Sequence, residues 1–185
     1  MRPVPPLSAS LASPSDGGSI DLLIAIMNEQ PEQRAAIAAA GAIPVLVQTI
    51  LPASHVRAST LGAAAEALRC LTHDNPPNRT AVAHAGGLAP LLALARMDDS
   101  GCQKYAAAAL GNLIFKSEPN LRALREAGGV ALLERLARGR EPAVAEAARR
   151  ALITNGIGHW GRSRAGARCT RDDLARSCPR KQLTR

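Results

Sequence analysis

The chain contains very few aromatic residues: Tyr105, Phe115 and Trp160 are the only three among 185. Proteins that bind single-stranded nucleic acid stack successive bases on aromatic side chains, and this chain offers no such platform. Its core must therefore be built from Ala, Leu, Val and Ile. Small aliphatic side chains let helix backbones approach closely, which favours helices packed on helices over a β-sheet.

Closely spaced cysteines and long apolar runs are also missing. The four cysteines show no Cys-x-x-Cys spacing and no secretory signal precedes them, which favours reduced thiols inside the cell. No apolar run approaches the roughly 20 residues needed to span a bilayer. We therefore expect a soluble protein of the cytoplasm, the nucleus or both.

No constellation of catalytic or metal-binding residues stands out. The four histidines lie in different stretches without a His-Glu-x-x-His spacing, and the chain has no glycine-rich phosphate loop. His159, Cys169 and Cys178 supply three zinc-type ligands, but the gaps of 10 and 9 residues fit no common spacing and a fourth ligand is missing. We expect no cofactor, no metal and no enzymatic activity.

The charge is unevenly distributed. The formal net charge is +8, of which +6 lies between residues 156 and 185, so the rest is close to neutral. Residues 156–185 lack an apolar period and predict a basic, disordered tail. The alternative is a basic arm for nucleic acid, a membrane or nuclear import. Residues 1–19, rich in proline and serine, predict a disordered leader. A transit peptide is the alternative there, although Arg2 is its only base.

The body of the chain repeats itself. Equivalent positions recur 42 residues apart, as shown by Gly86 and Gly128, Asn78 and Asn120, and Cys70 and Asn112. An earlier copy precedes these at an offset of 45 residues, since Gly41 stands to Gly86 at that distance. A period of this length is typical of a stacked array of helical units.

Each unit is predicted to hold two short helices and one long helix. A half-unit over residues 20–27 precedes three full units, whose expected helices are 33–40, 43–47 and 54–72; 78–85, 88–97 and 100–115; and 120–127, 130–138 and 142–155. Small and aliphatic residues recur at three- and four-residue steps on the first two long helices: Leu61, Ala64, Ala65, Leu68 and Leu71, then Ala106, Ala107, Ala109, Leu110 and Leu113.

This pattern resembles armadillo repeats. The residues that carry the resemblance are Ala109-Leu110-Gly111-Asn112-Leu113, Gly41-Ala42-Ile43-Pro44 and Gly86-Gly87-Leu88-Ala89. The resemblance implies an all-α, right-handed α-solenoid over residues 20–155, with about three units and an N-terminal half-unit. Repeats of the HEAT type, which have two main helices, are the structural alternative. Arg149, Arg150 and Thr154 on the last helix fit the polar end that a solenoid requires.

In the armadillo family the third helices line a concave groove, and an asparagine at the Asn112 position bonds the backbone of an extended peptide. Members that bind nuclear localisation signals carry a tryptophan one turn earlier. The asparagine positions here read Ala25, Cys70, Asn112 and Thr154, and the tryptophan positions read Glu66, Ala108 and Arg150. The candidate groove residues are therefore Glu66, Cys70, Lys104, Tyr105, Ala108, Asn112 and Arg150.

Some of these side chains could instead have a purely structural role. Asn112 is either a peptide ligand or a cap on a neighbouring backbone carbonyl, Tyr105 is an anchor or a core filler, and Cys70 is expected to be a small buried apolar residue. The resemblance implies a monomeric adaptor that binds a protein or peptide. Alternatives are an adaptor for nuclear transport similar to importin alpha, or a nucleic-acid binder acting through the basic tail. The chain is either a whole array or a piece of a longer one.

Overall fold

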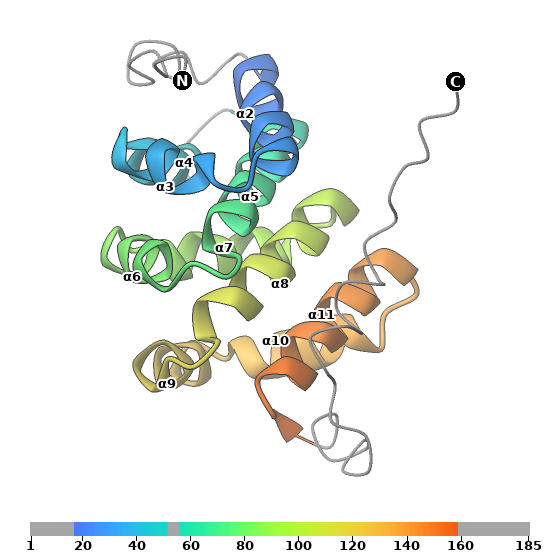
Figure 1. The fold of residues 1–185 in the computed structure, drawn as a ribbon. Helices are drawn as coiled ribbons and strands as arrows, with labels where there is room; N and C mark the ends of the chain where they lie inside the picture. The colour runs from blue at the N-terminus through green and yellow to red at the C-terminus, as the bar shows by residue number, and fades with distance from the viewer. Residues whose placement is uncertain (1–16, 52–55, 159–185) are drawn as a thin grey trace, which may run out of the picture.

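The computed structural model describes residues 17–51 and 56–158. Within these residues it is entirely helical, with ten helices and no strand. Figure 1 shows the helices stacked as successive units along one axis. In chain order they are α2 Gly17–Glu29, α3 Gln33–Ala39, α4 Ala42–Thr49, α5 Ala58–Thr72, α6 Pro76–His84, α7 Leu88–Arg96, α8 Ser100–Ile114, α9 Glu118–Glu126, α10 Gly129–Ala137 and α11 Pro142–Thr154.

The predicted order of two short helices followed by a long one is confirmed in all three units. The main differences concern where helices begin. The first helix begins at Gly17 rather than at residue 20. Helix α5 begins at Ala58 rather than at residue 54, and residues 54 and 55 of the predicted helix lie outside the described part. The body also extends slightly beyond residue 155, because Ile157 is buried in the core.

Glycines with positive φ separate the first helix of each unit from the second. Gly41, Gly86 and Gly128 have φ values of +85°, +74° and +71°. A side chain is strained in this left-handed region, which explains why glycine recurs with the repeat. Helix α8 begins differently, because Asp99 at its N-cap accepts a hydrogen bond from the Cys102 backbone N–H at 2.8 Å.

Two asparagines, Asn78 buried and Asn120 half-buried, join the second and third units to the units before them. Asn78 Nδ2 donates to the carbonyl of Leu71 at 2.9 Å, and Asn120 Nδ2 donates to the carbonyl of Leu113 at 2.8 Å. Both carbonyls belong to the last turn of a long helix, where the helix itself supplies no donor. The 42-residue spacing between the two asparagines therefore reflects one hydrogen bond made twice.

The core is a continuous aliphatic layer between the long helices. Helix α5 packs against α8, α8 packs against α11, and α2 covers the other side of α5. All ten residues predicted to form the apolar faces of α5 and α8 are buried. Since each long helix buries one side against its neighbour, stability comes from contacts between units.

Two glycines in the long helices have opposite packing environments, which predicts opposite effects of the same substitution. A Cβ added to Gly62 meets only ordinary contacts, the nearest being the Cys102 nitrogen at 3.6 Å. A Cβ added to Gly111 lies 2.7 Å from the Ala151 Cβ and 3.0 Å from its Cα. Gly62→Ala should therefore stabilise the protein by about 0.5–1 kcal/mol through helix propensity.

Gly111→Ala should instead destabilise it, since α8 and α11 must separate and overpacking costs about 1–3 kcal/mol. Urea unfolding followed by circular dichroism measures both variants. If Gly111→Ala raises the free energy of unfolding as Gly62→Ala does, the close contact between Gly111 and Ala151 is not a feature of the folded protein.

Candidate functional site: the third-helix surface

The long helices that end each unit share one partly exposed surface. In Figure 1, α5, α8 and α11 follow one another on one side of the array, and α3, α6 and α9 lie on the other. We call the partly exposed side chains of these long helices the third-helix surface. It comprises Glu66, Arg69, Lys104, Tyr105, Ala108, Asn112 and Arg150.

A polar cluster spans α5 and α8 at the centre of this surface. Glu66 forms an ion pair with Arg69 at 3.5 Å. The Lys104 Nζ lies 4.5 Å from the centre of the Tyr105 ring and 3.5 Å from its hydroxyl oxygen. Partial burial raises the pKa of Tyr105, and the charge of Glu66 and a hydrogen bond with it raise that pKa further. Tyr105 therefore keeps its proton and presents a neutral hydroxyl beside charged groups.

Asn112 is engaged with its own chain. Its Nδ2 donates to the carbonyl of Arg69 at 3.1 Å and to Oγ1 of Thr72 at 3.3 Å, both in the last turn of α5. An asparagine amide has two N–H donors, so these bonds account for both. The amide nitrogen of Asn112 therefore caps the end of α5, which is one of the two roles considered from the sequence. Recognition of a peptide by the amide oxygen stays a prediction.

Asn155 makes the equivalent bond one unit later, and the sequence reading missed it. Its Nδ2 donates to the carbonyl of Gly111 at 3.1 Å, and Gly111 stands 42 residues after Arg69. The donor is shifted by one residue relative to the 42-residue register, which pointed to Thr154. Thr154 itself is exposed. An asparagine directly beside the expected position was the available signal.

Cys70 does not belong to the exposed surface. Its side chain is only 1% exposed, so it cannot line a groove, and the prediction of a small buried residue describes it. Arg69 donates to its sulfur at 3.2 Å, and the sulfur lies 3.6 Å from Oδ1 of Asn28 on α2. Burial raises the pKa of the Cys70 thiol. Cys70 thus connects α5 to α2 in its protonated form.

The remaining predicted residues lie on α8 and α11. Ala108 is half-buried and lies three residues after Tyr105 and four before Asn112, which places the three on one face of α8. Arg150 is exposed and pairs with Glu146 at 3.8 Å. Both residues share the third-helix surface, and Arg150 lies on α11, one helix further along than the cluster on α5 and α8.

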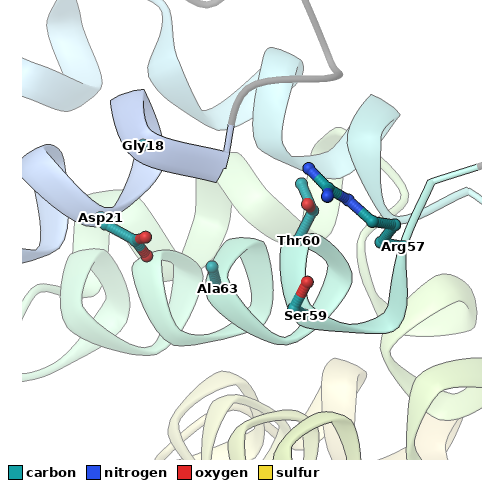
Figure 2. A pocket seen from close by; sticks show the side chains of 6 residues that line it. All are labelled: Gly18, Asp21, Arg57, Ser59, Thr60 and Ala63. Atoms are coloured by element: carbon teal, nitrogen blue, oxygen red, sulfur yellow. The ribbon is translucent and has the colours of Figure 1, made fainter.

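A polar hollow continues this surface toward α2. Figure 2 shows Asp21 of α2 facing the first turns of α5, and the hollow is lined by Gly18, Asp21, Arg57, Ser59, Thr60 and Ala63. Ser59 and Ala63 precede Glu66 by seven and three residues, which places them on the same face of α5. Sequence reasoning did not select these residues, because the hollow depends on how α2 packs on α5.

The described residues contain no group of three side chains arranged to hold a metal ion. His159, Cys169 and Cys178, weighed above as zinc ligands, lie outside the described residues. No helix within residues 17–51 and 56–158 combines the length and apolar character that crossing a bilayer demands.

Three-helix units stacked through their long helices define an α-solenoid repeat protein. Residues 75–115 match the family model of the Armadillo/beta-catenin-like repeat. That match covers one repeat unit, and the structural similarities described next show that the chain has the fold of armadillo repeat solenoids.

Several solved structures that are similar to this chain are engineered or designed proteins. An engineered protein from the Northeast Structural Genomics Consortium is 28% identical with a TM-score of 0.72, and the match covers 83% of this chain and 62% of that one. A designed armadillo repeat protein in complex with the peptide (KR)4 is 23% identical with a TM-score of 0.69, covering 82% and 64%.

A natural counterpart is the armadillo repeats only protein of Plasmodium falciparum, at 20% identity and a TM-score of 0.65, covering 86% of this chain and 70% of that one. This chain spans less than two thirds of the length of the two designed proteins. Among curated proteins, none matches the chain.

Proposed function

We propose that this protein is a binding adaptor that holds an extended segment of another polypeptide on its third-helix surface. The observation that carries the proposal is the cluster of Glu66, Lys104, Tyr105 and Asn112, whose side chains stay partly exposed on adjoining helices. An aromatic ring with a polar tip, surrounded by donors and acceptors, suits recognition of both backbone and side chains. The function is binding, and it involves no reaction.

Two of the similar designed proteins support this use of the fold. One is in complex with the peptide (KR)4, and another group is described as designed for modular peptide recognition, with 25% identity and a TM-score of 0.66. These are properties of those proteins. Their relevance here is that stacked armadillo units can serve as a peptide-binding surface.

Selection from a displayed library of random 12-residue peptides tests the proposal. We expect the folded protein to enrich peptides whose binding is lost with Tyr105→Ala. Removing a central tyrosine from an interface typically costs more than about 1 kcal/mol, which corresponds to roughly a fivefold or greater loss of affinity.

Asn155→Ala is the matched control for Asn112→Ala, since both side chains donate to a carbonyl of the preceding long helix. If Asn112 also contacts the peptide, only its substitution should weaken binding. Failure to enrich any peptide, or full binding by Tyr105→Ala, would remove the third-helix surface from the account.

The two alternatives stay hypotheses. Among the positions at which signal-binding relatives carry tryptophan, the only carboxylate is Glu66, which is already paired with Arg69. Nucleic-acid binding through the basic tail concerns residues outside the described part, apart from 156–158. A truncation that tests it should begin after Gly158, because Ile157 is buried in the core.

A further inference from the structure

Arginines on three different helices place positive charge near His73, the residue that follows α5. Burial lowers the pKa of His73, and the charges of Arg34, Arg69 and Arg150 lower it further, against the opposite effect of Asp74. These arginines come from α3, α5 and α11. Although they are far apart in sequence, all three act on the same imidazole at the edge of the third-helix surface.

Two carboxylates on or beside the third-helix surface are paired with arginines, whereas Asp74 at its edge lies 3.8 Å from His73. Glu66 pairs with Arg69 at 3.5 Å, and Glu146 pairs with Arg150 at 3.8 Å. Lys104 adds a further positive charge and lies against the ring and hydroxyl of Tyr105. The surface around Tyr105 and Asn112 therefore carries more positive than negative charge.

We propose that the third-helix surface selects an acidic segment of its partner polypeptide, with Asp or Glu side chains placed toward Lys104, Arg69 and Arg150. This inference rests on the proposed function and specifies the chemistry of its partner. The ammonium of Lys104 and the guanidinium of Arg150 attract carboxylates, and the Tyr105 hydroxyl and the Asn112 amide oxygen face the peptide between them.

Charge also argues against two other occupants. The C-terminal residues 156–185 of the chain carry a net charge of +6, so they have the same sign as the surface. A peptide rich in Lys and Arg, such as the one bound by the designed protein, meets the same repulsion. The preference should weaken with salt, because exposed charges are screened over about 8 Å at physiological ionic strength.

The composition of the peptides enriched from the library tests this inference separately from the proposed function. We expect Asp and Glu to be enriched, and Lys and Arg depleted, relative to the unselected library. Enrichment of uncharged or basic peptides that still require Tyr105 would overturn the charge inference and leave the binding function intact. Failure to enrich any peptide overturns both.

A second test reverses the charge of one arginine in each of two comparable ion pairs. Arg150→Glu should weaken binding of a selected acidic peptide by about threefold to tenfold in low salt. Arg125→Glu is the control, because Arg125 pairs with Glu118 at 3.6 Å with similar exposure but lies on α9, a first helix of its unit. Equal losses for both variants would show an effect of net charge alone and would overturn the assignment to this surface.

Discussion

Leu110→Ala is expected to lower the free energy of unfolding by about 3 kcal/mol, within the range of about 2–5 kcal/mol measured for buried leucines. Leu110 is fully buried on α8, the long helix that packs against both α5 and α11. Removing its side chain weakens contacts between units as well as within one. Since a repeat array depends on contacts between neighbouring units, we also expect a less cooperative urea transition.

Leu22→Ala is the matched control, because Leu22 carries the same side chain on α2 but is 63% exposed. A surface substitution of this kind typically changes stability by less than about 0.5 kcal/mol. Urea unfolding monitored by circular dichroism compares the two variants directly. Equal losses of stability would mean that α8 is not the centre of the packed array.

The thiol of Cys102 should react with iodoacetamide at pH 8 at least about a thousandfold more slowly in the folded protein than in urea. Burial, followed by a hydrogen bond with Asp99 and the charge of Asp99, raises the pKa of Cys102 from 9.0 to about 12. The thiolate is the reactive form, and the sulfur also lies 3.3 Å from the carbonyl of Ala58, to which its S–H donates.

Mass spectrometry of the peptide that contains Cys102 measures this rate apart from the other cysteines. A folded rate within tenfold of the unfolded rate would show that the contact between α5 and α8 opens readily.

The raised pKa of Cys102 also has a consequence for stability. The unfolded chain releases this proton above about pH 9 whereas the folded chain keeps it, so Cys102 makes the free energy of unfolding fall as the pH rises from 9.0 toward about 12.

Most of the fold could be predicted because the repeat makes each position appear more than once. The apolar faces of α5 and α8 follow from three- and four-residue spacing, and the glycine turns follow from Gly41, Gly86 and Gly128. Both signals are local, and each unit confirms the others. The start of α2 at Gly17 was missed since a glycine pair and a preceding proline-rich stretch disfavour a helix.

The candidate site could be predicted only in part, because it depends on contacts between units. Asn155 donates to the same carbonyl position as Asn112 although it lies one residue outside the 42-residue register. A register carried along the sequence cannot show such a shift. The charge of Arg34 on α3 likewise lowers the pKa of His73, which lies at another position of the unit in the sequence. The hollow beside Asp21 forms only when α2 packs on α5.

Amide hydrogen exchange of the protein with and without a selected peptide tests most directly whether the third-helix surface is the binding site. Bound peptide should slow exchange in α5 and α8, around Glu66, Tyr105 and Asn112, and leave exchange in α6 and α9 unchanged. Protection confined to α6 and α9, with none in the long helices, would contradict it.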